Sequence, residues 1–207
     1  MEKNFNRKAH WENIYQTKTP QEVSWYQPTP NTSLELLEAA NITPEQHIID
    51  IGGGDSLLVD NLLKKGFYFI SVLDISKAAL QKAKERLGEQ AKHVHWIEAD
   101  AANLELKEQY DCWHDRAAFH FLTDKLEIES YVNAAQQHLK KGGTLIIGTF
   151  STEGPKKCSG IEIKQYNEAE LVATFEPFFE KINCFTINHQ TPFNTTQNFI
   201  FCVFKRK

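Results

Sequence analysis

Three acidic residues and a run of glycines occupy related positions along this sequence. Asp50 lies in a short apolar run, just before the three glycines that begin at Gly52. Asp74 and Asp100 end or follow two later apolar runs, and Asp74 lies 20 residues after Gly54. A carboxylate offers two acceptor oxygens and no donor, so it suits ribose hydroxyls or the amino group of a purine. Glycines would let such a ligand approach free backbone N–H groups.

Each of these features also has a simpler interpretation. The glycines could form an ordinary loop between a strand and a helix, Asp74 could cap a helix, and Asp100 could lie in a turn. Their joint occurrence at the ends of three successive apolar runs favours a crevice that binds adenosine.

A second group of reactive side chains follows the fourth apolar run: His114, Asp115, Arg116 and His120. A histidine titrates near neutrality and could take a proton from a thiol or an amine. Alternatively, His114 is a core residue and His120 a surface residue. Arg116 could bind an anionic acceptor through two hydrogen bonds, or it could pair with the neighbouring Asp115.

The N-terminal segment, residues 1–30, is rich in aromatic residues. Trp11 and Tyr15 are four residues apart, so on a helix they share a face. Trp25 and Tyr26 follow before two prolines. These rings either pack as a stripe on the rest of the domain or form a lid over a flat ligand.

Strand-like and helix-like patterns alternate up to residue 150, which predicts a parallel sheet with helices on both faces and a crevice at the carboxyl ends of its strands. Residues 189–195 are too short for a parallel crossover, so the last two strands should be antiparallel. Thr32 with Glu35 reads as a capping box, and Ser76 as a helix cap. The expected strands are Ile48–Ile51, Phe67–Leu73, His93–Glu98, Tyr110–His114, Thr144–Phe150, Phe179–Asn188 and Thr196–Phe204; the expected helices are a short one after Thr32, then Ser56–Lys65, Lys77–Leu87, Asp124–Leu139 and Asn167–Phe175.

Composition sets the broad class. The 207 residues are 41% hydrophobic and carry a net charge of −4, as expected for one globular domain that is not a dedicated nucleic-acid binder. No apolar stretch is long enough to span a membrane, and the polar start lacks a secretory signal, so we expect a cytoplasmic protein. The four cysteines form no C-x-x-C pair. We therefore expect reduced thiols, an exposed Cys158 and no metal site.

The motifs DIGGGDS, LDIS, EAD and YDCWHDRAAFHFL resemble the successive motifs of class I S-adenosylmethionine-dependent methyltransferases. The resemblance covers nearly the whole chain. WHDRAAF and the aromatic N-terminal segment are also loosely similar to thiopurine methyltransferase-like enzymes. Ser56 stands where the usual pattern has its third glycine. A glycine-rich NAD-binding domain is the rival interpretation, and the antiparallel ending counts against it.

The resemblance implies an α/β, Rossmann-like three-layer sandwich, with a seven-stranded mostly parallel sheet and an antiparallel final strand. Residues 1–30 would form the lid, and residues 31–207 a single domain. S-adenosylmethionine would be the cofactor: Gly52 and Gly54 would lie under its methionine part, Asp74 at the ribose and Ile75 against the adenine. The expected cofactor-binding residues are Trp11, Tyr15, Trp25, Tyr26, Asp50, Gly52, Gly54, Asp74, Ile75, Asp100, Ala101 and Asp115, and the catalytic candidates are His114, Asp115, Arg116 and His120.

Methyl transfer from a sulfonium is an in-line displacement, so the protein mainly aligns donor and acceptor and excludes water. We expect a small-molecule acceptor, with no nucleic-acid or membrane partner. The alternatives are a methyltransferase for lysine or another protein side chain, and a non-catalytic protein that binds S-adenosylmethionine or a nucleotide. WHDR stands where enzymes that methylate nucleobase or glutamine amino groups carry an asparagine-proline-proline-aromatic signature.

Overall fold

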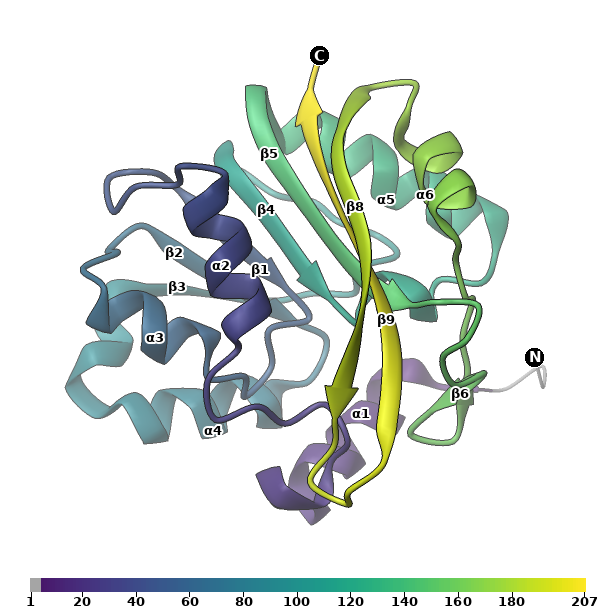
Figure 1. Cartoon of the computed structure of the whole chain (residues 1–207). Helices are drawn as coiled ribbons and strands as arrows, with labels where there is room; N and C mark the ends of the chain where they lie inside the picture. The colour runs from purple at the N-terminus through teal and green to yellow at the C-terminus, as the bar shows by residue number, and fades with distance from the viewer. Residues whose placement is uncertain (1–4) are drawn as a thin grey trace.

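The computed structural model describes residues 5–207, so the first four residues of the expected lid segment lie outside the described residues. One seven-stranded sheet runs through the molecule in the order β3-β2-β1-β4-β5-β9-β8 (Figure 1). β1 to β5 are parallel, and β9 runs antiparallel to both β5 and β8. The expected fold, including the antiparallel final strand, is confirmed. The strands are β1 Ile48–Ile51, β2 Ile70–Asp74, β3 Val94–Glu98, β4 Tyr110–Arg116, β5 Leu139–Phe150, β8 Phe179–Gln190 and β9 Thr196–Arg206, with a small hairpin of β6 Lys157–Cys158 and β7 Ile161–Glu162.

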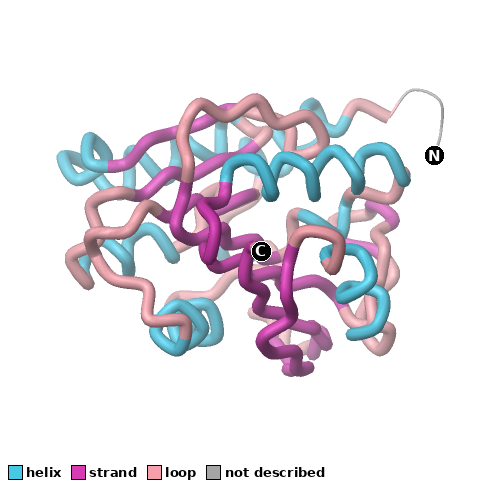
Figure 2. Tube along the Cα trace, turned by 90° about the horizontal axis from the view of Figure 1, so that it is seen from above, coloured by secondary structure: helices cyan, strands magenta, loops and turns pink. Residues whose placement is uncertain are grey.

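Helices cover both faces of this sheet, as the view from above shows (Figure 2). β1 explains why, since consecutive side chains of a strand point to opposite faces. Ile49 and Ile51 pack in one core cluster and Ile48 in the other, and all three are fully buried. A strand buried on both faces reads as a continuous apolar run. The helices are α1 Arg7–Thr17, α2 Asn31–Ala39, α3 Leu58–Lys64, α4 Lys77–Leu87, α5 Lys125–His138 and α6 Glu168–Phe175.

Most elements lie within a few residues of their expected bounds, and the differences have local causes. The capping box at Thr32 is wrong, because α2 begins at Asn31 directly after Pro30 and so contains both Thr32 and Glu35. The cap at Ser76 is confirmed, since its hydroxyl accepts a hydrogen bond from the N–H of Ala79. β5 begins at Leu139, before the expected start at Thr144, and so includes Gly142 and Gly143.

The expectation that all four cysteines are reduced is wrong for two of them. Cys184 and Cys202 lie directly opposite each other on β8 and β9 and form a disulfide. They are 18 residues apart in the chain, and only the pairing register of the hairpin brings them together. Cys112 and Cys158 are free and buried. Between residues 5 and 207, no helix is both long and apolar enough to cross a membrane.

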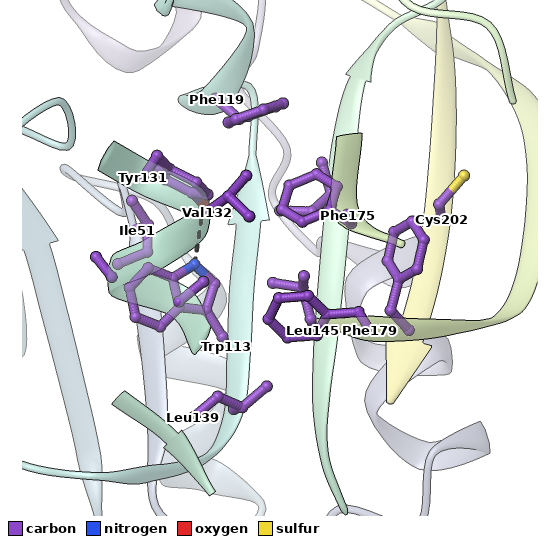
Figure 3. Close-up of a cluster of buried hydrophobic side chains, with 14 of the residues drawn as sticks. Ile51, Trp113, Phe119, Tyr131, Val132, Leu139, Leu145, Phe175, Phe179 and Cys202 are labelled. Atoms are coloured by element: carbon purple, nitrogen blue, oxygen red, sulfur yellow. Dashed lines mark hydrogen bonds between the residues drawn. The ribbon is translucent and has the colours of Figure 1, made fainter. Parts of the chain in front are cut away.

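A buried polar chain crosses the core between α5 and β4 (Figure 3). The Trp113 indole N–H donates to the Tyr131 hydroxyl at 2.9 Å, and this hydroxyl donates to Asp115 Oδ2 at 2.6 Å. All three side chains have no exposed surface. Tyr131 therefore satisfies a donor and an acceptor that have no access to water.

Replacing Tyr131 with phenylalanine should lower the free energy of unfolding by about 1–3 kcal/mol, because the indole N–H and the carboxylate then lose a partner inside the core. Urea denaturation followed by fluorescence would measure the change. Tyr68→Phe is the matched control, since Tyr68 is 60% exposed and its replacement should change stability by less than about 0.5 kcal/mol. Equal effects of the two variants would contradict a stabilising role for the chain.

Candidate active site

A cavity that opens to solvent lies at the edge of the sheet where the parallel strands end, and α1 covers part of it. In Figure 1, α1 and β6 lie at the end toward which the arrows of β4 and β8 point. The cavity is lined by Arg7, Trp11, Tyr15, Ser24, Trp25, Gly52, Leu73, Asp74, Ile75, Ala99, Asp100, Ala101, Arg116, Ala117, Ala118, Phe121, Leu122, Phe150, Cys158, Gln197 and Phe199.

The turn after β1 has no room for side chains. Gly52 and Gly54 have φ values of +66° and +49°, in the left-handed region that favours glycine. A Cβ added at Gly54 would lie 2.6 Å from the Tyr15 hydroxyl, and one added at Gly52 would lie 2.5 Å from Cβ of Ala118. The turn therefore brings bare backbone to the cavity, between β1 and the lid.

Asp74 lies at the end of β2, lines the cavity and is almost fully buried. Its Oδ1 accepts a hydrogen bond of 2.8 Å from the N–H of Ser76. Loss of hydration disfavours the charged form, and burial raises the pKa of Asp74 to about 7. Ile75 lines the cavity next to it. The structure thus places a carboxylate with one oxygen committed to the chain beside the glycine turn.

Two side chains of α1, Arg7 and Glu12, anchor this helix over the cavity. The Glu12 carboxylate accepts hydrogen bonds from the Ser76 hydroxyl at 2.8 Å and from the Ala78 N–H at 3.2 Å, so it caps the N-terminus of α4. The Arg7 guanidinium binds both Asp100 oxygens, at 3.1 and 3.2 Å, and also Glu127. Asp100 and Ala101 line the cavity as expected, but Asp100 also serves as an anchor for the lid.

The structure brings together three of the four expected lid rings. Trp11 lies 5.7 Å from Trp25 and 5.0 Å from Phe121, and Tyr15 lies 6.2 Å from Trp25, measured between ring centroids. Trp11 and Tyr15 also pack on Ala79 of α4. These rings therefore pack on the rest of the domain and also line the cavity, and their role as a lid over a ligand stays a prediction. Tyr26 is different, because it lines two neighbouring pockets and not this cavity.

Asp115 and His120 lie behind the wall of the cavity and not in it. The Asp115 carboxylate accepts from the N–H groups of Ala118 and Phe119 and from Tyr131, so it fixes the turn after β4. Burial raises the pKa of Asp115 to about 6. His120 is fully buried, its Nδ1 accepts from the Phe150 N–H, and burial lowers its pKa to about 3. Asp115 and His120 therefore do not line this cavity, and their predicted contact with a cofactor or an acceptor stays a prediction.

His114 belongs to a buried chain beside the glycine turn. Its Nδ1 lies 2.7 Å from Asp50 Oδ1, and its Nε2 lies 2.9 Å from the Ser33 hydroxyl. The imidazole ring thus bridges the Asp50 carboxylate and the Ser33 hydroxyl. These three residues line a smaller pocket that they share with Gly52 and Gly53. The chain holds Asp50 in a set orientation under the turn.

Arg116 is the expected catalytic candidate that lines the main cavity. It does not pair with Asp115. Its Nη1 donates to the carbonyl of Trp25 at 3.0 Å, and its Cζ lies 5.0 Å from the ring centroid of Phe199. Nη2 is buried and has no hydrogen-bond partner within residues 5–207. Burial lowers the pKa of Arg116 to about 10, which leaves the guanidinium charged at neutral pH.

Sequence reasoning missed one half of the cavity. Phe150, Gln197 and Phe199 come from β5 and β9, and no local motif marks them as wall residues. The expectation of an exposed Cys158 is wrong: it is 5% exposed, lines the cavity from the β6–β7 hairpin, and burial raises its thiol pKa to about 12. In the part of the chain that the structure describes, no three His, Cys, Asp or Glu side chains gather as metal ligands.

Comparisons with known proteins agree with this geometry. Residues 48–143 match the family model described as a methyltransferase domain. A malonyl-[acyl-carrier protein] O-methyltransferase of Anoxybacillus flavithermus is 32% identical over 117 residues, which are 56% of this chain and 42% of that protein. The eEF1A lysine and N-terminal methyltransferase of Mus musculus is 27% identical over 137 residues, 65% of this chain and 18% of that protein. This chain therefore spans less than half the length of these two relatives.

Two solved structures share the fold over nearly the whole chain. A SAM-dependent methyltransferase from Anabaena variabilis superposes with a TM-score of 0.77 at 17% identity, covering 99% of this chain and 96% of that one. The N-methyltransferase NodS from Bradyrhizobium japonicum, in complex with S-adenosyl-L-homocysteine, gives a TM-score of 0.71 at 12% identity, covering 97% and 99%. At these identities the likeness concerns the fold.

Proposed function

We propose that this chain transfers a methyl group from S-adenosylmethionine to a small-molecule acceptor, since residues 48–143 match a family model described as a methyltransferase domain and a solved S-adenosylmethionine-dependent methyltransferase shares the fold. One observation carries the proposal: a single cavity joins carboxylates at strand ends, a turn of bare backbone and a wall of aromatic rings. The proposal keeps the expected cytoplasmic location and the organisation into a lid, residues 1–30, and a single domain, residues 31–207.

The residues at the β1–β2–β3 end of the cavity suit the cofactor. Asp74 offers its second oxygen to the ribose hydroxyls, and Ile75 and Ala101 offer apolar surface to the adenine. A Cβ at Gly52 or Gly54 would collide with Ala118 or Tyr15 and push the walls of the cavity apart, so the bare backbone there suits a close approach of the methionine part. When bound, S-adenosylmethionine supplies an electrophilic methyl group on a positively charged sulfur, which is its own leaving group.

Trp11, Trp25 and Phe121 form the wall next to this turn. The faces of aromatic rings attract a cation. A sulfonium next to these rings is stabilised by cation–π interactions and needs no carboxylate beside it. The same rings exclude water from the line between donor and acceptor. Arg116 cannot act as a base while it is charged, so in this proposal the acceptor enters with a lone pair already available.

A small acceptor fits this cavity better than a protein side chain. α1 covers the cavity, and Arg7 and Glu12 anchor this helix to Asp100, Glu127 and the N-terminus of α4. A protein substrate would reach the cavity only if α1 moved away and the contacts of Arg7 and Glu12 broke. The relatives include enzymes named for protein acceptors and for an acyl-carrier-protein substrate, so their names do not decide between the two.

The direct test is incubation with S-adenosylmethionine labelled on the methyl group, together with a panel of thiols, amines and carboxylates and a cell extract. We expect label in low-mass products and stoichiometric release of S-adenosylhomocysteine. The control is the same mixture with the Asp74→Asn variant. Label found only on protein would favour a protein methyltransferase, and tight binding without any transfer would favour a non-catalytic binding protein.

Replacing Trp25 with alanine should weaken binding of S-adenosylmethionine by about tenfold or more, because the sulfonium loses an aromatic face in a dry site. The backbone carbonyl that Arg116 holds is retained in this variant. Isothermal titration calorimetry would measure the affinity, with Tyr68→Ala as the control for loss of a ring from the exposed surface. An unchanged affinity in Trp25→Ala would remove the argument for a lid.

The affinity for S-adenosylhomocysteine should fall as the pH drops below about 7. The pKa of Asp74 is raised to about 7, so the carboxylate that accepts from the ribose becomes protonated below that pH. Each pH unit further down should raise the Kd by up to about tenfold, and the Kd should level off above about pH 8. Calorimetry between pH 6 and 8.5 measures this profile. The Asp74→Asn variant should bind S-adenosylhomocysteine more weakly, and its Kd should not change with pH in this range. The same change of Kd with pH in both proteins would mean that another group titrates.

A further inference from the structure

The cavity has a second half that the cofactor residues do not use. The sheet order places β3, β2 and β1 on one side of β4, and β5 and β9 on the other. β9 is antiparallel, so its first residues lie at the same edge as the last residues of β4 and β5. Arg116, Phe150, Gln197 and Phe199 therefore line the half over β4, β5 and β9. The inference drawn from this half rests on the proposed function.

Arg116 brings a buried charge to this half and forms no ion pair with a carboxylate among residues 5–207, where Asp50 attracts it only from a distance. The carboxylate of the adjacent Asp115 is already occupied by two backbone N–H groups and by Tyr131. Nη1 uses its hydrogen bond on the Trp25 carbonyl, and Nη2 has no partner among the described residues. A buried charge without a partner is costly, and an anion that reached Nη2 would offset this cost.

The guanidinium reaches from β4 toward β9, and it also borders the smaller pocket beside the glycine turn. Its Cζ lies 5.0 Å from the ring centroid of Phe199 on β9. Between the two strands lies β5, where Gly148 pairs with Arg116 on one side and with Phe201 on the other. Gly148 has no side chain to block this path, and a Cβ there would lie 2.4 Å from the Phe201 ring. The charge thus serves the half of the cavity next to β9.

Gln197 adds a second buried polar atom without a partner among the described residues, and this atom is a hydrogen-bond acceptor, whereas Arg116 Nη2 is a donor. It lies two residues before Phe199 on β9, so the two side chains share a face of the strand. Its Oε1 is buried and has no hydrogen-bond partner among residues 5–207. Phe150 and Phe199 form the apolar wall beside it, with ring centroids 4.8 Å apart. A fitting ligand therefore has an apolar body, an anionic group and a hydrogen-bond donor.

We propose that this half of the cavity binds the methyl acceptor as an apolar small molecule with an oxyanion, typically a carboxylate, which Arg116 holds while Gln197 accepts a hydrogen bond from a neighbouring donor group. A planar guanidinium matches a carboxylate through two parallel hydrogen bonds. Selectivity for the acceptor then comes from the charge as well as from the size of the pocket, because a neutral analogue leaves Nη2 without a partner.

The test measures binding to the protein saturated with S-adenosylhomocysteine. Pairs of an oxyanion and its neutral amide or alcohol serve as probes: acetate, phenylacetate, indole-3-acetate and phenyl phosphate with their counterparts. We expect at least one aromatic oxyanion to bind ten times more tightly than its counterpart. Arg116→Gln keeps an N–H donor for the Trp25 carbonyl and should abolish this preference. Gln197→Glu supplies an internal carboxylate and should abolish it as well, and both variants should keep their S-adenosylhomocysteine affinity within threefold.

Lys156→Gln is the matched control, because Lys156 is an exposed cation in the segment that leads to the β6–β7 hairpin. An equal loss of the preference for oxyanions in Lys156→Gln would mean that the overall positive charge near the cavity causes this preference, and it would overturn the inference. So would the absence of any preference for oxyanions. A loss of S-adenosylhomocysteine affinity in Arg116→Gln with the preference retained would place the cofactor carboxylate at Arg116. Failure of the unmodified protein to bind S-adenosylhomocysteine would instead reject the proposed function.

Discussion

The site depends on a turn from which side chains are excluded. At Gly52, Gly53 and Gly54 an added Cβ would meet, respectively, Ala118 from the segment after β4, Asp50 and Val72 from β1 and β2, and Tyr15 from α1. Two of these glycines also need a left-handed backbone. Three parts of the chain converge on one turn, and the cavity can exist there because the turn leaves backbone exposed to it. A methyl group at this turn would push the lid, the sheet and the loop after β4 apart together.

Buried polar groups around this turn divide into two kinds. Trp113, Tyr131 and Asp115 satisfy one another and two backbone N–H groups, and Ser33, His114 and Asp50 form hydrogen bonds with one another on the other side. Satisfied networks of this kind make a core rigid and specify one arrangement. Arg116 and Gln197 have unsatisfied buried atoms, and both lie in the cavity wall. The satisfied networks position the wall of the cavity. A ligand that forms hydrogen bonds with the unsatisfied atoms would remove the cost of burying them, and this would favour its binding.

α1 is held over the cavity by two kinds of contact. Trp11 and Tyr15 bury their rings on α4, while Arg7 forms part-buried ion pairs with Asp100 and Glu127, and Glu12 caps the N-terminus of α4. Ion pairs at a protein surface contribute little to stability, typically about 0–1 kcal/mol each, since water replaces their partners readily. An enzyme that must admit a cofactor and release its product benefits from this division, because the rings close the cavity and the ion pairs set the position of the helix.

The sequence by itself determined the order of strands and helices, the antiparallel ending, and the residues at the ends of β1, β2 and β3, because these follow from local periodicity, glycine positions and spacing along the chain. Only the tertiary structure decided which reactive side chains reach the cavity. Asp115 and Arg116 are neighbours in the chain, yet adjacent residues of a strand point to opposite faces, so one is committed to the core and the other to the cavity. The pairing of Cys184 with Cys202 and the wall from Phe150, Cys158, Gln197 and Phe199 depend on register between distant strands, which no local pattern encodes.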